Sequence, residues 1–262
     1  MTKRYGIIGY PLSFTLSPKM HNRAFSHLGI DALYETFRVK DVREAIKLIK
    51  ETPLLGVSVT MPYKESVMEF LDEIDEVAQK IGAVNTILNH EGRLYGFNTD
   101  WIGVVRALKE VTPLEGKRVL VLGAGGGARA ACYAFKKEGA IIGISSRTFE
   151  KTQKLAFSFD GEAIEWEKRH KWDCEVVINA TPLLNEMPFP KESIKEGMVL
   201  MDMVYNPPIT PFLEEGRKKG AKVVSGLRML LFQGVKQFEI WLDMKAPEEV
   251  MWEALKEVTS SL

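Results

Sequence analysis

Two side chains in the first hundred residues could exchange a proton with a substrate. Lys64 ends the sequence Met61-Pro62-Tyr63-Lys64, which follows the predicted strand 56–60, and Asp100 stands before a predicted helix. Pro62 interrupts the strand, so Lys64 is expected at its carboxyl end, where α/β proteins bind ligands. An amine beside a carboxylate can take the proton of a secondary alcohol when a cofactor accepts the hydride. A solvated lysine and a plain helix N-cap are the alternative interpretations.

A glycine-rich turn follows the apolar run 119–122 and precedes an alanine-rich segment. Strand, glycine turn and helix in this order are typical of a dinucleotide site. Gly123 permits the tight turn, Gly125 lets the backbone approach a pyrophosphate, and Ala128 keeps helix and strand close, with the helix N-terminus facing the phosphates. A glycine turn that only packs is the alternative. The predicted phosphate-binding residues are Gly123, Ala124, Gly125, Gly126 and Gly127.

The second strand of this series indicates which dinucleotide is bound. An NAD site places a carboxylate at the end of that strand, about 20 residues after the glycines. This strand ends instead in Ser146-Arg147-Thr148, with Lys151 close behind. A guanidinium and an ammonium group can pair with a 2′-phosphate, and hydroxyls can donate to it. NADP is therefore the predicted cofactor, although solvated surface charges would give the same pattern.

A pair of hydroxyl residues brackets a predicted helix start. Ser17 precedes Pro18, which suits the first helical position, and Thr15 stands two residues earlier. Hydroxyls, free N–H groups and the helix dipole could together bind a small carboxylate. Ser17 could equally be only a helix cap.

The composition excludes several classes of protein. Apolar residues make up 45% and charged residues 27%, and the 35 basic and 35 acidic side chains cancel, so no bulk field would attract nucleic acid. Cys132 and Cys174 have no zinc-like spacing, and no metal is expected. The uncharged run 5–18 contains glycine, proline and serine and is shorter than the roughly 20 residues of a membrane span. We expect a cytoplasmic protein without a membrane or nucleic-acid partner.

The predicted elements alternate between strands and helices. Strands over 5–9, 34–39 and 56–60, with helices over 17–28 and 42–50, form a βαβαβ unit, followed by strands over 82–88 and 94–97 and a helix after Asp100. A second series has strands over 118–122, 141–145, 176–179, 199–203 and 222–224. Helices over 229–241 and from 247 onward come last. The pattern predicts an α/β fold with two domains: a substrate-binding domain (1–101 with 230–262, to which the C-terminal helices return) and a Rossmann-type NADP-binding domain (102–229).

Many ordered segments along nearly the whole chain resemble the shikimate and quinate dehydrogenase family. The resemblance implies NADP-linked, reversible reduction of 3-dehydroshikimate to shikimate, in the route to chorismate and the aromatic amino acids. The matching segments are Gly9-Tyr10-Pro11, Leu16-Ser17-Pro18, His21-Asn22, Gly56 with 59–64, 82–86, Asn98-Thr99-Asp100, Arg147-Thr148, Asn179-Ala180-Thr181, 202–207, Gly226-Leu227, Met229-Leu230 and Gln233-Gly234.

The resemblance also implies roles for single residues. Lys64 corresponds to the lysine that exchanges the proton, and Asp100 to its carboxylate partner, which also binds a ring hydroxyl. The other substrate contacts implied are Thr15, Ser17, Thr60, Asn85, Tyr205 and Gln233. The cofactor contacts implied beyond the glycine turn are Glu76, Ser146, Arg147, Thr148, Lys151, Thr181, Met203 and Gly226. Glu76 could also be one of several solvated acids in 72–76.

Several positions depart from the family pattern, among them Ser146, which replaces the usual Asn before Arg147, and 182–184, which lack the family's nearby glycine. Phe14, Thr15 and Ser58 stand where the family commonly has His, Ser and Asn. The methyl group that threonine adds changes the pocket size, so quinate is a second candidate substrate. A ligand-sensing regulator that keeps the sites without turnover is another alternative, which Lys64 and Asp100 disfavour. A folate-linked dehydrogenase fits the predicted carboxylate site less well. A monomer and a homodimer are both compatible with the sequence.

Overall fold

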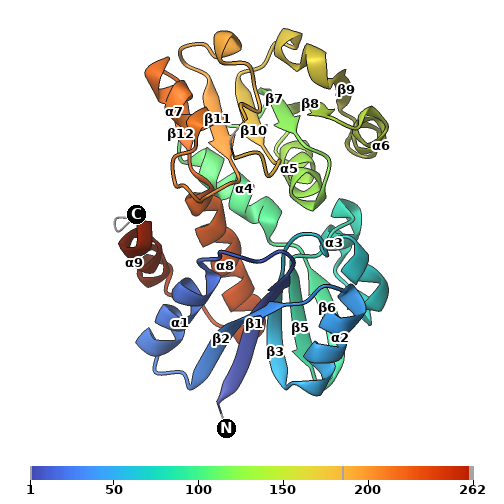
Figure 1. The fold of residues 1–262 in the computed structure, drawn as a ribbon, viewed down its shortest axis with the longest axis vertical. Helices are drawn as coiled ribbons and strands as arrows, with labels where there is room; N and C mark the ends of the chain where they lie inside the picture. The colour runs from blue at the N-terminus through green and yellow to red at the C-terminus, as the bar shows by residue number, and fades with distance from the viewer. Residues whose placement is uncertain (1, 185, 260–262) are drawn as a thin grey trace. The chain divides into compact units, whose positions relative to one another are not determined.

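Two six-stranded sheets form the framework of the chain, one in each of two units (Figure 1). The computed structural model describes residues 2–184 and 186–259. Unit 1 comprises Met1–Thr99 with Leu231–Leu262, and unit 2 comprises Asp100–Leu230. Each unit alternates strands with helices, which confirms the predicted α/β class.

The sheet of unit 1 has the order β2-β1-β3-β5-β6-β4. Its β1 pairs in parallel with β2 and β3, whereas β5 is antiparallel to both β3 and β6, and β4 pairs in parallel with β6. The strands are β1 (Lys3–Gly9), β2 (Ala32–Arg38), β3 (Leu54–Val59), β4 (Glu73–Ile74), β5 (Thr86–His90) and β6 (Arg93–Phe97). The helices are α1 (Ser17–His27), α2 (Val42–Glu51), a 3₁₀ helix (Ser66–Phe70), α3 (Glu76–Ile81) and α9 (Glu248–Thr259).

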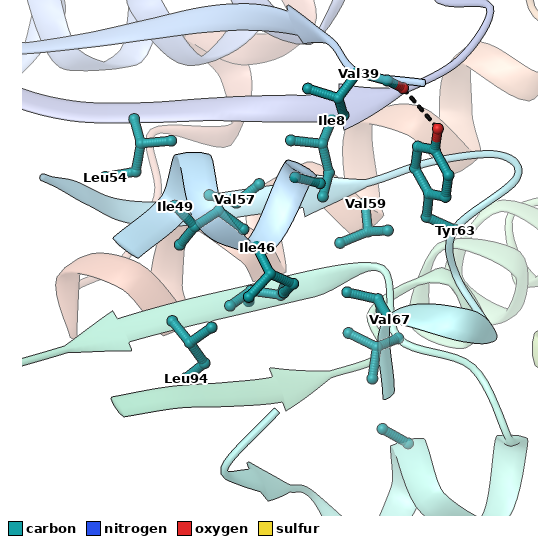
Figure 2. Packing of buried hydrophobic residues seen from close by; sticks show 14 residues of the cluster. Ile8, Val39, Ile46, Ile49, Leu54, Val57, Val59, Tyr63, Val67 and Leu94 are labelled. Carbon is teal, nitrogen blue, oxygen red and sulfur yellow. Dashed lines mark hydrogen bonds between the residues drawn. The ribbon is translucent and has the colours of Figure 1, made fainter. Parts of the chain in front are cut away.

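A cluster of buried aliphatic side chains packs between this sheet and α2 (Figure 2). Ile46 and Ile49 come from α2, and Ile8 and Val57 from the sheet. The spacing of Ala45, Ile46 and Ile49 places them on one face of α2, and Asp41 caps this helix by accepting from the N–H groups of Arg43 and Glu44. The helix is therefore fixed both by burial and by its cap.

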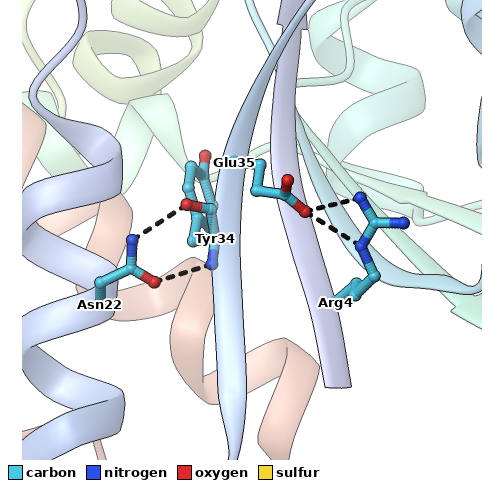
Figure 3. Close-up of polar contacts among 4 residues, drawn as sticks. All are labelled: Arg4, Asn22, Tyr34 and Glu35. Carbon is cyan, nitrogen blue, oxygen red and sulfur yellow. Dashed lines mark hydrogen bonds and ion pairs between the residues drawn. The ribbon is translucent and has the colours of Figure 1, made fainter. Parts of the chain in front are cut away.

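A different polar contact fixes α1 to the edge strand β2. The Asn22 amide donates to the carbonyl of Tyr34 at 2.9 Å and accepts from the N–H of Tyr34 at 2.7 Å (Figure 3). Next to it, Arg4 on β1 donates to Glu35 on β2 at 2.7 and 3.0 Å. The amide of Asn22 thus satisfies both backbone groups of a residue on the sheet edge.

The sheet of unit 2 is wholly parallel, with the order β12-β11-β10-β7-β8-β9. This is the doubly wound order of a Rossmann-type domain, whose ligands bind beyond the carboxyl ends of the strands where the order reverses. The strands are β7 (Arg118–Leu122), β8 (Ile141–Ser146), β9 (Glu162–Glu165), β10 (Val176–Asn179), β11 (Val199–Asp202) and β12 (Lys222–Val224). The helices are α4 (Asp100–Lys109), α5 (Gly126–Lys137), α6 (Phe149–Phe159), α7 (Pro211–Lys218) and two 3₁₀ helices (Trp166–Lys171 and Lys191–Ser193).

Helix α8 (Gly226–Leu242) begins in unit 2 and continues into unit 1. It starts three residues before the predicted helix over 229–241. No helix among the described residues combines the length and the apolar character that a bilayer span needs.

Two local predictions were wrong. The predicted strand over 82–88 begins only at Thr86, because Gly82, with φ of 70°, ends α3 in the left-handed conformation. Ser17 does not cap α1: Leu16 is the N-cap residue, and the Thr15 hydroxyl accepts from the N–H of Ser17 at 3.3 Å. The side chain that serves this helix start is therefore Thr15, one position earlier than a cap normally stands.

Candidate active site

Backbone hydrogen bonds hold Lys64 in unit 1. Its carbonyl accepts from the N–H of Val84 at 2.7 Å. The neighbouring Tyr63 is buried and donates its hydroxyl to the carbonyl of Val39 at 2.6 Å (Figure 2). Lys64 itself is half-buried after the end of β3, as expected. The position of its Cα is thus fixed by neighbours on two other segments.

Asn85, directly after Val84, joins several segments of unit 1. Its side-chain carbonyl accepts from the N–H of Thr99 at 2.7 Å, and its amide donates to Thr99 Oγ1 at 3.0 Å and Gln233 Oε1 at 3.3 Å. All three residues are more than nine-tenths buried. The structure therefore brings together Asn85 and Gln233, which lie far apart in the sequence.

The remaining predicted substrate residues lie at four other places. Thr60 is half-buried after β3, and its N–H donates to the carbonyl of Ile8. Thr15 and the buried Ser17 stand at the start of α1 in unit 1. Asp100, which is 3% exposed, is the first residue of α4 and follows Thr99 directly. Tyr205 is half-buried in unit 2, after β11.

The glycine turn after β7 has the backbone that a dinucleotide requires. Gly123 has a φ of 124°, and a Cβ there would lie 2.9 Å from the carbonyl oxygen of Ala180. Only glycine tolerates this conformation easily. Gly125 is exposed and is the N-cap of α5 without a side-chain cap, so the first N–H groups of the helix are not taken by a capping side chain. The turn is thus open to an anion at the helix N-terminus.

Three other predicted cofactor residues lie around this turn. A Cβ on Gly123 would approach the methyl group of Thr181, and one on Gly127 would lie 3.1 Å from the sulfur of Met203. A Cβ on Gly226 would lie only 2.6 Å from the carbonyl oxygen of Met203. The glycines allow these close approaches. Thr181, Met203 and Gly226 are therefore gathered beside the glycine turn.

Residues 146–151, after β8, divide into buried and exposed groups. The buried hydroxyl of Ser146 contacts the Thr148 carbonyl at 3.0 Å and the Thr152 hydroxyl at 2.7 Å, so it braces the loop. Arg147, Thr148 and Lys151 are exposed at the start of α6. Glu76 lies elsewhere, in the first turn of α3 in unit 1, where it is exposed and accepts from Lys80 at 2.6 Å.

The sequence analysis missed a buried polar network that supports the cofactor loops. The Asn179 amide donates to Asp202 Oδ1 at 2.9 Å, and the Thr210 hydroxyl donates to Asp202 Oδ2 at 2.7 Å. Asn179 also accepts from the hydroxyl of Thr181 at 2.6 Å. Burial raises the pKa of the Asp202 carboxyl, although the hydrogen bonds that it accepts from Thr210 and Asn179 oppose the shift. Polar residues ending two buried strands, Asn179 on β10 and Asp202 on β11, were the available signal.

Two further groups bear on the chemistry. Cys132 is buried in α5, and burial raises the pKa of its thiol, which disfavours the reactive thiolate. Within residues 2–184 and 186–259, no three His, Cys, Asp or Glu side chains gather as metal ligands do.

Comparisons with known families match most of the chain. Residues 7–87 match the family described as the shikimate dehydrogenase substrate binding domain, and residues 106–205 match shikimate / quinate 5-dehydrogenase. Residues 226–256 match the shikimate 5′-dehydrogenase C-terminal domain. A curated relative from Pyrococcus furiosus, named shikimate dehydrogenase (NADP(+)), is 42% identical and covers 95% of this chain and 94% of its own length.

Several solved structures with the same fold are shikimate dehydrogenases. The shikimate dehydrogenase of Aquifex aeolicus superposes with a TM-score of 0.92 at 36% identity, covering 97% of this chain and 98% of that one. The enzyme from Thermus thermophilus, solved with NADP(H) and shikimate, has a TM-score of 0.90 at 37% identity, covering 98% and 99%. The similarity thus extends over both units.

Proposed function

Because this chain belongs to the shikimate dehydrogenase family, we propose that it reduces 3-dehydroshikimate to shikimate with NADPH and catalyses the reverse oxidation. The observation that carries this proposal is the junction at Val84 and Asn85, where backbone and side-chain bonds hold Lys64, Thr99 and Gln233. The reaction belongs to the synthesis of chorismate and the aromatic amino acids.

The substrate carboxylate is assigned to the start of α1. The Thr15 oxygen accepts from the N–H of Ser17, so its own hydroxyl hydrogen remains able to point to an anion. Ser17 adds a second hydroxyl at the same helix N-terminus. Thr60, Asn85, Asp100, Tyr205 and Gln233 are assigned to the ring hydroxyls and the carboxylate. Each of these side chains can exchange hydrogen bonds with a hydroxyl group.

Lys64 and Asp100 are assigned to the proton transfer. NADPH, when bound, supplies the hydride for the carbonyl carbon. In this reduction Lys64 donates a proton to the carbonyl oxygen, and in the oxidation it takes the proton back from the hydroxyl. Asp100 is assigned as the carboxylate partner of Lys64 in this proton exchange and as a contact of a ring hydroxyl.

The residues around the glycine turn fit NADP. The main chain from Gly123 to Gly127 and the N-terminus of α5 would hold the pyrophosphate. Arg147 and Lys151, both exposed, would pair with the 2′-phosphate, with Ser146 and Thr148 shaping their loop. Thr181, Met203 and Gly226 would border the ribose and the nicotinamide, and Glu76 is assigned a place near the cofactor.

Absorbance at 340 nm tests the proposal with the purified protein, using shikimate or quinate with NADP or NAD in all four combinations. Rapid reduction with shikimate and NADP alone is the expected result. Faster turnover of quinate than of shikimate would identify quinate as the preferred substrate. A preference for NAD over NADP would overturn the role assigned to Arg147. Cofactor binding without turnover in any combination would favour a ligand-sensing regulator.

The working state proposed is a cytoplasmic monomer or homodimer without a nucleic-acid or membrane partner. The balanced charge of 35 basic and 35 acidic residues supports this proposal, as do the free thiols Cys132 and Cys174. Light scattering at several protein concentrations distinguishes monomer from dimer.

A further inference from the structure

A chain of buried hydroxyl and amide groups crosses unit 1 from β2 to α8. The Tyr34 hydroxyl donates to Ser58 Oγ at 2.7 Å, and the Ser58 hydroxyl donates to Gln237 Oε1 at 2.8 Å. The amide of Gln237 then donates to Thr86 Oγ1 at 3.0 Å and to the carbonyl of Asn85 at 3.1 Å. Each of these side chains is at most 5% exposed. None of Tyr34, Ser58, Thr86 and Gln237 has a role in the reaction as proposed above.

Two backbone groups set the direction of every bond in this chain. The carbonyl of Asn85 can only accept, so the NH₂ end of Gln237 must face it, which turns the oxygen of Gln237 toward Ser58. The N–H of Thr99 can only donate, so the oxygen of the Asn85 side chain must face it. Both amide orientations are therefore determined.

The hydroxyl of Thr86 connects the two amides. It lies between the NH₂ group of Gln237, at 3.0 Å, and the side-chain oxygen of Asn85, at 2.8 Å. A hydroxyl has one hydrogen, so it must accept from Gln237 and donate to Asn85. Hydrogen bonds aligned in one direction in a buried site strengthen each other.

The chain ends on Gln233. Its side-chain oxygen accepts from the amide of Asn85 at 3.3 Å, which turns the NH₂ end of Gln233 away from Asn85. A ligand that meets this end of Gln233 must offer an acceptor, such as the lone pair of a hydroxyl group.

We propose that Thr86 and Gln237 are positioning residues that hold the amide of Asn85 and, through it, orient the NH₂ end of Gln233 to donate a hydrogen bond to the substrate ring. This inference rests on the function proposed above. Thr86 acts directly on the amide of Asn85, Gln237 acts one step further back, and Tyr34 lies beyond both. The Tyr34 hydroxyl bonds only Ser58 in this chain, so its loss leaves the bonds of Thr86 and Gln237 to Asn85 in place.

Steady-state kinetics on four single variants of the full chain test this order. Thr86→Val keeps the shape of the side chain but cannot bond either amide, and we expect the KM for shikimate to rise about fivefold to tenfold, the effect of one lost hydrogen bond. Thr86→Ser keeps the hydroxyl and should restore the KM to within about twofold. Gln237→Met should resemble Thr86→Val, which gives a second test if one of the two variants does not fold.

Tyr34→Phe is the matched control, because it removes an equally buried hydroxyl. It should lower the melting temperature while leaving the KM values for shikimate and NADP within about twofold of wild type. All four variants should keep the wild-type KM for NADP. An unchanged shikimate KM in Thr86→Val and Gln237→Met, or equal increases in Tyr34→Phe, would overturn the positioning role alone. A wild-type protein that does not turn over shikimate with NADP would overturn the proposed function and, with it, this inference.

Discussion

The N–H of Val84 donates to the carbonyl of Lys64 at 2.7 Å, one residue before Asn85. This bond uses only the main chain, so the Lys64 side chain is not needed to hold its own segment in place. Substitution of the side chain therefore tests chemistry separately from folding.

Replacing Lys64 by alanine should lower kcat for shikimate oxidation by about 10²- to 10⁴-fold, the range lost with a general acid–base group. The KM for NADP and the melting temperature should change little, because the Val84 bond remains. Initial rates at 340 nm measure kcat and KM, and thermal unfolding measures the melting temperature. Lys47→Ala, at an exposed position on α2, is the control and should behave as wild type. Wild-type turnover by Lys64→Ala would rule out its role as the proton carrier.

Replacing Arg147 by alanine should weaken the binding of NADP but not that of NAD. The guanidinium group is exposed after β8 and is assigned to the 2′-phosphate, which NAD lacks. We expect the KM for NADP to rise about tenfold or more, the effect of one charge-assisted contact, while the KM for NAD stays the same. Lys154→Ala, on the helix α6 that follows Arg147, is the control, because Lys154 is exposed and pairs with Glu150. Equal increases for the two cofactors would contradict the assignment.

Two glycines of unit 2 should separate cofactor binding from stability. A Cβ on Gly226 would meet three carbonyl oxygens within 2.8 Å, so Gly226→Ala should lower the free energy of unfolding by about 1–3 kcal/mol. A Cβ on Gly125 has no heavy atom within 4 Å, so Gly125→Ala should leave the stability of the cofactor-free protein within about 0.5 kcal/mol.

The same Gly125→Ala variant should bind NADP at least tenfold more weakly, because its methyl group occupies the approach of the pyrophosphate. Denaturant unfolding without cofactor and titration with NADP measure the two effects. Full NADP affinity in Gly125→Ala would show that the turn is not where the pyrophosphate binds.

His21 should make stability depend on pH in the acid range. It is wholly buried beside Tyr34, with ring centroids 4.6 Å apart, and burial lowers its pKa to about 3. The unfolded chain takes up a proton near pH 6.5 and the folded chain does not. Its contribution to stability is therefore complete above pH 6.5 and is lost as the pH falls toward 3, by up to about 1.4 kcal/mol per pH unit.

Urea unfolding of wild type and His21→Phe at several pH values measures this slope. Phenylalanine keeps an aromatic ring at the position but has no proton to bind. The difference in unfolding free energy between the two proteins should change across the range from pH 6.5 to 4. Parallel curves would mean that His21 is not the group responsible.

Strand positions were predictable where apolar runs end at turn residues. The bounds of β7, β10 and β12 agree with the sequence prediction because each is a short apolar run beside glycine or polar residues. Helix α3 was missed because six residues carry too little periodicity, and Gly82 was therefore assigned to a strand. The sequence did not reveal that the Thr15 hydroxyl accepts from the first N–H group of α1. The N-cap position falls on Leu16, whose backbone is already helical, and not on Ser17.

The polar interior was less predictable than the motifs. The residue types of the glycine turn and of the segment 146–151 carry their chemistry in local sequence. Ser58 and Gln237 are 179 residues apart, and Thr86 and Gln237 are 151 apart, so no local pattern connects them. The same holds for Asn179 and Asp202, whose contact depends on the pairing of β10 with β11. Such partners become visible only when the strand order is known.

The course of α8 also decides the order in which the newly made chain can assemble. Unit 2 is one continuous stretch, 100–230, inserted into unit 1, whose last part starts at Leu231. During synthesis this stretch leaves the ribosome complete and can fold as a unit, whereas residues 1–99 still lack α8. Until Gln237 emerges, the hydroxyls of Ser58 and Thr86 have not met the amide that joins them. The unit that begins the chain is thus the last to be finished.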